Sequence, residues 1–377
     1  MCREVLFISG TRADFGKIKP LISTVENMRD FKSSIFVTGM HMMEKYGNTY
    51  KEVERSGFKN IYKYINQHVN EPMEMVLANT VHGLSRFIHE NRPDMIVVHG
   101  DRVEALAGAI VGSMSNILVA HIEGGERSGT IDELIRHSVT KLSHVHLVAN
   151  QEAKNRVAQM GELPQTIRVI GSPDIDVMKS EDLPMIEEVL SHYDIEFDDY
   201  HIVMFHPVTT EYDMFSSFSK NLVDALLESE ENFIVIYPKN DYGTNKILEE
   251  YKRLEGNKHF KIFPSIKFES FLVMIKYCKS VIGNSSAGIR EAPIYGVPTI
   301  NVGTRQNLRY KFDTIVDVGY SKHDIVDAIK RISDYAEENH ISEYFGEGNS
   351  ADLFRDMLLD DEMWSIPQQK IFVDMGR

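Results

Sequence analysis

Residues 95–137 read MIVVHGDRVEALAGAIVGSMSNILVAHIEGGERSGTIDELIRH. Two apolar runs in this stretch, Met95–Val98 and Ile117–Ala120, are short enough to be strands buried on both faces. Helical spacing over Val103–Met114 joins them, and a strand, a helix and a second strand in succession predict neighbouring parallel strands with a right-handed crossover. The stretch therefore indicates an α/β fold with a parallel sheet.

Acidic residues follow both apolar runs. Asp101 stands after the first run, Glu123 after the second, and Asp132 a few residues further on. Ligands of open α/β sheets bind at the carboxyl ends of the strands, and neighbouring strands lie only about 5 Å apart. We therefore expect these three carboxylates to converge on one crevice and to carry the chemistry.

Two alternatives remain open at this stretch. Asp132 lies at the start of a helix and four residues before Arg136, so the residues alone favour a helix cap or an ion-pair partner of Arg136. The histidines can orient the carboxylates, shuttle protons or simply be satisfied core residues. These histidines are His99, His121 and His137.

The same alternation of short strands and helices extends over the whole chain. Its 377 residues exceed the roughly 250–300 at which a single core stops growing, so two domains are expected. We place the first at 1–173 and the second at 174–351, with an acidic linker or peripheral helix over 174–200 and a helical segment at 352–377. Residues 44–70 are expected to be helix and loop. Further strands are expected at 5–8, 34–38, 146–149, 167–170, 202–207, 233–237, 260–263, 280–283, 299–302 and 315–318.

Composition narrows the class of protein. A formal net charge of −15 disfavours nucleic acid as the main partner, because phosphate backbones need a basic face. No apolar run approaches the ~20 residues of a membrane span, so no membrane partner is expected. The two cysteines, Cys2 and Cys278, have no metal-ligand spacing and favour a reducing, cytoplasmic location. We expect neither a metal nor a bound cofactor, since dinucleotide and P-loop fingerprints are absent.

Two glycine-containing loops lie where strands give way to helices. Gly10–Lys17 follows the first strand, where a helix N-terminus can hold an anion, although an ordinary turn with exposed charges explains it as well. Gly283–Gly288 follows a later strand and contains Ser285 and Ser286. These serines can grip a diphosphate or act as an N-cap, and both roles are compatible.

Several motifs together resemble one known family. They are Gly10-Thr11-Arg12-Ala13-Asp14, His99-Gly100-Asp101-Arg102, His121-Ile122-Glu123-Gly124-Gly125-Glu126, His206-Pro207-Val208-Thr209-Thr210, Gly283-Asn284-Ser285-Ser286 and Gly303-Thr304-Arg305-Gln306. In this order, over about residues 5–320, they resemble UDP-N-acetylglucosamine 2-epimerases. The chain is more similar to the hydrolysing branch, which makes N-acetylmannosamine for sialic acid, because its first and third motifs depart from the usual motifs of the non-hydrolysing relatives.

The resemblance implies a GT-B-like fold, in which two Rossmann-like domains face a central cleft and the nucleotide lies mostly on the C-terminal one. The last helix, around 352–359, then crosses back to the first domain. Asp101, Glu123 and Asp132 match the family's catalytic acids. The positions that match substrate or UDP ligands are Arg12, Asp14, Lys17, His41, Arg102, His206, Phe271, Ser285, Ser286, Arg290 and Glu291.

This family's chemistry is elimination followed by hydration. A base removes the C2 proton of the sugar as UDP leaves C1, and water then adds to the 2-acetamidoglucal. Carboxylates near one another suit this acid and base work, and the fork of donors on Arg102 suits the diphosphate. Three alternatives remain: the same reaction on a UDP-diacetamido-trideoxyhexose of the legionaminic acid route, a GT-B glycosyltransferase, and a nucleotide-sugar binding protein without turnover. Relatives are usually homodimers or homotetramers.

Overall fold

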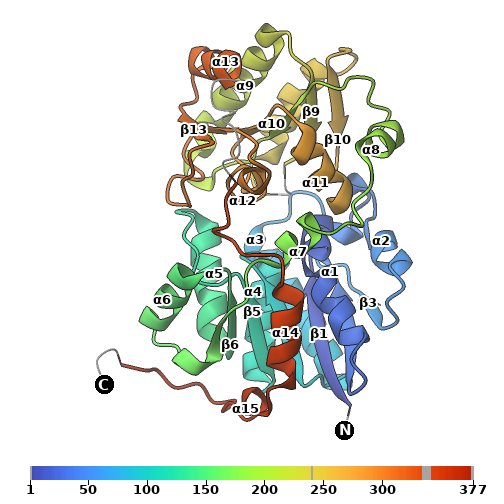
Figure 1. The fold of residues 1–377 in the computed structure, drawn as a ribbon, viewed down its shortest axis with the longest axis vertical. Coiled ribbons are helices and arrows are strands. Elements are labelled where there is room, and N and C mark those ends of the chain that lie inside the picture. Colours follow the sequence, from blue (N-terminus) through green and yellow to red (C-terminus); the bar gives the residue numbers. More distant parts are fainter. Residues whose placement is uncertain (1, 239–240, 333–340, 375–377) are drawn as a thin grey trace. The chain divides into compact units, whose positions relative to one another are not determined.

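The computed structural model describes residues 2–238, 241–332 and 341–374, which form two compact units (Figure 1). The first unit takes the chain up to Arg127, Ile131–Ser180 and the segment from Tyr344 onward. The second takes Ser128–Thr130 and Glu181–Glu343. The boundary expected from the sequence, between residues 173 and 174, lies inside the first unit.

A seven-stranded parallel sheet forms the centre of the first unit, in the order β3-β2-β1-β4-β5-β6-β7. Apolar residues that alternate along its strands belong to two separate cores. Val5 and Phe7 of β1 pack in one core, and Leu6 and Ile8 pack in the other. This double burial explains why the strands read as continuous apolar runs. Their bounds are β1 (Arg3–Ser9), β2 (Phe31–Val37), β3 (Ile61–Lys63), β4 (Met95–His99), β5 (Leu118–Ile122), β6 (Val145–Val148) and β7 (Ile167–Val169).

Helices cover both faces of this sheet. One core includes residues of α1 and of the late helix α14, whose Phe354 lies 6.2 Å from Phe7 between ring centroids. The other includes residues of α3, α4 and α5. The late segment is thus part of the first unit. The helices are α1 (Arg12–Glu26), η1 (Gly39–Met42), η2 (Glu44–Tyr46), α2 (Tyr50–Arg55), α3 (Met73–Glu90), α4 (Val103–Met114), α5 (Ile131–Leu142), α6 (Gln151–Gln159), η3 (Pro164–Thr166), α7 (Pro173–Met178), α14 (Ser350–Leu359) and α15 (Asp361–Trp364).

A six-stranded parallel sheet forms the centre of the second unit, in the order β10-β9-β8-β11-β12-β13. Residues of α9 and α13 pack on one of its faces in a third core. The strands are β8 (His201–Met204), β9 (Phe233–Ile236), β10 (Phe260–Phe263), β11 (Ser280–Gly283), β12 (Thr299–Val302) and β13 (Ile315–Val318). The helices are α8 (Ile186–His192), η4 (Thr209–Met214), α9 (Phe215–Ser229), α10 (Thr244–Tyr251), η5 (Lys252–Leu254), α11 (Phe268–Tyr277), α12 (Ala287–Arg290), η6 (Ala292–Tyr295) and α13 (Lys322–Arg331).

Both sheets have a topological switch point, where successive crossovers leave in opposite directions. It lies between β1 and β4 in the first unit and between β8 and β11 in the second. This strand order is that of doubly wound Rossmann folds, which bind ligands outside the carboxyl ends of the strands at the switch point. The expected α/β class with two Rossmann-like parallel sheets is therefore confirmed.

Two segments differ from the sequence-based expectation. Residues 44–70 contain the short strand β3 besides helix and loop, and β3 was missed because its three residues sit among polar neighbours. Residues 174–200 do not form one linker, since α7 belongs to the first unit and α8 to the second. Among the residues that the structure describes, no helix is long and apolar enough to cross a membrane.

Candidate active site

A chain of charged groups runs across the switch point of the first unit. Asp14 follows β1 on the first turn of α1, His99 ends β4, and Glu123 follows β5. The Nδ1 atom of His99 lies 2.8 Å from Oδ1 of Asp14, and its Nε2 atom lies 3.2 Å from Oε2 of Glu123. Three neighbouring strands are therefore joined at their carboxyl ends by two carboxylates and one imidazole.

Arg136 of α5 extends this cluster. Its guanidinium forms an ion pair with Asp101, which follows β4, and donates a hydrogen bond of 2.8 Å to the carbonyl oxygen of Glu123. It also lies 3.3 Å from the carboxylate of Glu126. The side chain of Arg136 is only 3% exposed. A single buried cation therefore brings Asp101 and the Glu123 backbone together. The convergence of the three carboxylates on one crevice stays a prediction.

Glu123 has an unusual backbone conformation. Its φ of 64° lies in the left-handed region, which is energetically unfavourable for residues other than glycine. The other described residues of this kind, apart from glycines, are exposed or half-buried, whereas Glu123 is 4% exposed. The hydrogen bond from Arg136 and the contact with His99 hold this conformation. Strain that is maintained in this way is typical of functional sites.

Asp132 lies in the first turn of α5 and is half-buried. Arg136, which follows it by one turn, forms ion pairs with Asp101 and Glu126. A catalytic role for Asp132 stays a prediction.

Arg102 is held by a buried carboxylate that sequence reasoning missed. Its Nε and Nη2 atoms donate to the two oxygens of Glu104 at 3.0 and 3.3 Å. Glu104 is 2% exposed and packs against Gly39, where a Cβ atom would lie 2.5 Å from its Oε1. Gly39 also has a φ of 65°, so a glycine is required there. This arrangement fixes the direction of the Arg102 guanidinium.

Three other expected ligands of the first unit have partners within the protein. The Nε atom of Arg12 donates to Glu52 at 2.6 Å, and Lys17 forms an ion pair of 2.8 Å with the buried Asp174. His41 is fully buried between the hydroxyls of Ser9 and Thr49, at 3.0 and 2.8 Å. Burial lowers the pKa of His41 to about 4, so its imidazole is neutral. These contacts favour a structural contribution from His41.

The switch point of the second unit is built around Asn284. Its Oδ1 accepts from the backbone nitrogen of His206 at 2.7 Å, and its Nδ2 donates to the His206 carbonyl at 2.9 Å. Gly283 makes this approach possible, since a Cβ atom there would lie 2.1 Å from the Met204 carbonyl oxygen and its φ is 127°. The loops after β8 and β11 are thereby locked together.

Two further residues brace the same loop. Gln306 and Arg305 donate to the carbonyl oxygen of Asn284, at 2.7 and 3.2 Å. Both side chains follow β12 and are buried. The loop after β12 therefore fixes the path of the loop after β11, and the serines after Asn284 are held in place.

The serine loop leads into a short helix. Ser285 is buried and Ser286 half-buried, and α12 after them has only four residues before Pro293 ends its hydrogen bonding. A helix this short has a weak dipole, so serine hydroxyls and backbone donors must supply any grip on an anion. The remaining predicted ligands of this unit are all buried: His206, Phe271, Arg290 and Glu291.

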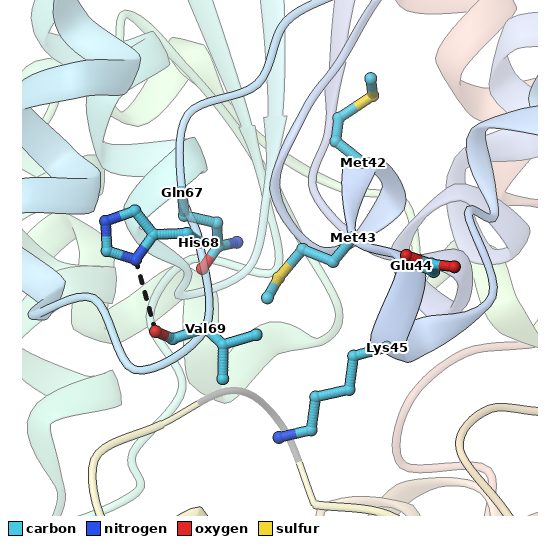
Figure 2. A pocket seen from close by; sticks show the side chains of 7 residues that line it. All are labelled: Met42, Met43, Glu44, Lys45, Gln67, His68 and Val69. Carbon is cyan, nitrogen blue, oxygen red and sulfur yellow. Dashed lines mark hydrogen bonds between the residues drawn. The ribbon is translucent and has the colours of Figure 1, made fainter.

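A separate hollow of about 550 Å³ lies in the first unit (Figure 2). Figure 2 shows that the segment 42–45 lines one side of it and the loop 67–69 the other. None of the predicted site residues lines it. The hollow is therefore distinct from the carboxylate cluster. Across the described ranges 2–238, 241–332 and 341–374, no group of three or more acidic, histidine or cysteine residues is arranged to hold a metal ion.

Sequence reasoning missed the residues that position others. Arg136 was considered only as a partner of Asp132, and Glu104 reads as an ordinary residue on the surface of a helix. Asn284, Arg305 and Gln306 stand in the quoted motifs, but no role could be assigned to them. The polar character of Glu104 within an apolar helical stretch is a signal that could have found it, whereas Arg136 lies in a helix with several other charged residues and carries no such signal.

Comparisons with known proteins agree with this geometry. A family model described as UDP-N-acetylglucosamine 2-epimerase matches residues 23–359. A protein of Neisseria meningitidis serogroup B named UDP-N-acetylglucosamine 2-epimerase is 48% identical over 377 residues, which cover 99% of this chain and 100% of that protein. A Legionella pneumophila protein named UDP-N,N'-diacetylbacillosamine 2-epimerase (hydrolyzing) is 30% identical over 93% of this chain and 94% of its own.

The fold has a matching crystal structure. The UDP-GlcNAc 2-epimerase from Neisseria meningitidis bound to UDP-GlcNAc aligns with a TM-score of 0.79 at 19% identity, over 94% of this chain and 99% of that chain. Such an identity shows the fold alone, and the fold is the GT-B-like pair of Rossmann-like domains. The family model and the 48% identical relative show the family as well as the fold. The chain belongs to the UDP-N-acetylglucosamine 2-epimerase family.

Proposed function

We propose that the protein is a hydrolysing UDP-N-acetylglucosamine 2-epimerase, which converts UDP-N-acetylglucosamine and water into N-acetylmannosamine and UDP. The observation that carries this proposal is the cluster of Asp14, His99, Glu123 and Asp101 at the switch point of the first unit. Such a cluster supplies ionised groups that can take up and return protons in a poorly solvated place. The word "hydrolyzing" in the name of the Legionella relative supports the second half of the reaction.

The chemistry uses the leaving group at C1. A carboxylate removes the C2 proton, the electrons of that bond form a C1–C2 double bond, and the C1–O electrons leave with UDP. Water then adds its oxygen to C1 of the 2-acetamidoglucal, and a proton is added to C2 from the opposite face. Asp101, Glu123 and Asp132 are the proposed acids and bases. No cofactor takes part in this route, because the bonds that break supply all the electrons that the new bonds need.

We propose that Ser285 and Ser286 bind the diphosphate, that Glu291 binds the ribose and that Phe271 lies beside the uracil. Arg102 neutralises the charge that develops on the leaving diphosphate, since guanidinium groups bind phosphates with two parallel donors. Arg12, Asp14, Lys17, His206 and Arg290 complete the proposed set.

The products of a single-substrate reaction test this function. Purified protein is incubated with UDP-N-acetylglucosamine alone, and proton and phosphorus NMR identify the products. The proposal predicts free N-acetylmannosamine and UDP. UDP-N-acetylmannosamine as the product would show a non-hydrolysing epimerase, and turnover only with an added acceptor would show a glycosyltransferase. UDP binding without any turnover would leave only a nucleotide-sugar binding protein.

The sugar can be tested in the same assay. The Legionella relative is named for UDP-N,N'-diacetylbacillosamine, which makes this sugar the second candidate. The greater identity to the Neisseria protein, 48% against 30%, favours UDP-N-acetylglucosamine. We therefore expect a higher kcat/KM for UDP-N-acetylglucosamine when both sugars are supplied, and the reverse order would assign the protein to the second route.

Arg102 and Glu104 provide a prediction for nucleotide binding. Arg102→Met should raise the Kd for UDP by about 10- to 100-fold, because hydrogen bonds to charged groups contribute about 1.5–3 kcal/mol. Glu104→Gln should have a smaller effect in the same direction, since it only loosens the guanidinium. Isothermal titration calorimetry measures both. Arg168→Met is the matched control, because Arg168 pairs with Asp360 on the surface. Equal affinities in all four proteins would remove Arg102 from the binding site.

Our proposal also includes the assembly and location of the protein. We propose a homodimer or homotetramer, and light scattering coupled to size-exclusion chromatography measures its mass against the 43.2 kDa of one chain. We further propose a cytoplasmic location, which the low cysteine content favours.

A further inference from the structure

Both ring nitrogens of His99 face carboxylate oxygens. The Nδ1 atom lies 2.8 Å from Asp14 and the Nε2 atom 3.2 Å from Glu123. A neutral imidazole has one N–H donor and one acceptor, so it would turn a lone pair toward one of these anions. An imidazolium turns positive charge toward both carboxylates and donates its Nδ1–H to Asp14. The two carboxylates around His99 therefore stabilise the positively charged form of its ring.

The surroundings of His99 strengthen both contacts. Its side chain and that of Asp14 are 10% exposed, and that of Glu123 is 5% exposed. The second oxygen of Asp14 accepts from the backbone nitrogen of Gly10 at 3.0 Å, so Asp14 cannot turn away. Little water reaches the three groups to screen their charges.

The charged groups around His99 agree with this state. Although burial lowers it, the carboxylates of Glu123 and Asp14 raise the pKa of His99 to about 10. His121 of β5 interacts electrostatically with His99, but burial lowers the pKa of His121 to about 3, so that ring is neutral. It is held by the Gly100 carbonyl and the Thr140 hydroxyl, at 2.8 and 3.1 Å. A neutral His121 does not repel the imidazolium of His99.

We propose that His99 is a positioning residue which, clamped as an imidazolium between Asp14 and Glu123, keeps Glu123 ionised and directed as the base that removes the C2 proton. This assignment rests on the proposed function. Glu123 accepts the proton and becomes a neutral acid, while the electrons of the C2–H bond form the double bond and UDP leaves. The proton added to the opposite face of C2 must then come from another group, because a carboxylate held in place by His99 addresses one face only.

The pH profile of His99→Gln tests the proposal. Removing the cation leaves Glu123 buried with one charged partner fewer, so Glu123 becomes protonated at higher pH. The acidic limb of log kcat/KM should move up by about 1–3 pH units, the usual effect of a neighbouring opposite charge. Activity lost at pH 6 should return in part at pH 9. A uniform loss at all pH values, with the limb unmoved, would show that His99 only supports the fold and would overturn the proposal.

His121→Gln is the matched control, because His121 is also a buried strand-end histidine but is neutral. The acidic limb of its log kcat/KM profile should lie at the same pH as that of the wild-type protein. An equal shift in this variant would show that the limb responds to general disturbance of the sheet, and it would also overturn the proposal.

A second measurement does not depend on activity. Nitrogen-15 NMR of histidine-labelled full-length protein gives the protonation state of each ring, and the resonance missing from His99→Gln identifies His99. We expect an imidazolium signal from pH 6 to pH 9. Titration near pH 6.5, the ordinary value for histidine, would overturn the proposal whatever the enzyme's products are. A cationic His99 in a protein that forms no N-acetylmannosamine would instead refute the proposed function, and the role of Glu123 as a base with it.

Discussion

Replacing Glu123 with Gln is expected to lower kcat by about 10²- to 10⁴-fold, the usual contribution of a general base. The amide has nearly the same shape, but it cannot accept the C2 proton. The Kd for UDP should stay unchanged, since Glu123 is assigned to the sugar chemistry and not to the diphosphate. Steady-state release of UDP measures the first effect and calorimetry the second. Asp132→Asn should behave in the same way if Asp132 is the returning acid.

Glu126→Gln is the control for this substitution. Glu126 is also buried and lies 3.3 Å from Arg136, but it has no assigned role in proton transfer. Its variant should retain most of the wild-type kcat. Near-normal turnover in Glu123→Gln, or loss of UDP binding together with the fold, would assign Glu123 a structural role instead.

Replacing Arg136 with Met should have the largest effect on stability. The substitution leaves Asp101 and Glu126 buried or half-buried without their common cation, and it frees the strained backbone of Glu123. Removing one partner of a buried ion pair costs about 3–5 kcal/mol. We expect the free energy of unfolding of the first unit to fall by that amount and turnover to be lost. Urea unfolding followed by circular dichroism measures the change.

Arg168→Met supplies the comparison for stability. Arg168 and Asp360 form an ion pair of 2.7 Å, but their side chains are 44% and 31% exposed. Exposed pairs contribute about 0–1 kcal/mol, so this variant should unfold close to the wild-type protein. Equal unfolding midpoints for the two variants would contradict a central role for Arg136.

The sheet could be predicted because its strands are buried on both faces. Such strands read as uninterrupted apolar runs, and the observed bounds of the fully buried β11 and β12 agree with those expected from the sequence. Parallel pairing then follows from the intervening helices. The strand β3 has no such run, since its three residues are half-buried or exposed, and it was missed for that reason.

The positions of the predicted carboxylates also follow from the apolar strand pattern. The side chains that contact the predicted site residues do not follow from it. Asp101 and Glu123 are placed by the ends of adjacent strands, whose register pairs His99 with Ile122. The contacts of Arg136 with Asp101 and of Glu104 with Arg102 depend on side-chain directions that no spacing encodes. Nor could the sequence distinguish His41, enclosed by two hydroxyls, from His99, enclosed by two carboxylates.

In the proposed reaction a proton leaves C2, and a solvent-derived proton replaces it on the opposite face. Running the reaction of UDP-N-acetylglucosamine in D₂O, and recording the proton NMR spectrum of the released sugar, tests this most directly. Elimination and hydration predict N-acetylmannosamine with one deuterium at C2. N-acetylmannosamine that retains its original hydrogen at C2 would contradict the account.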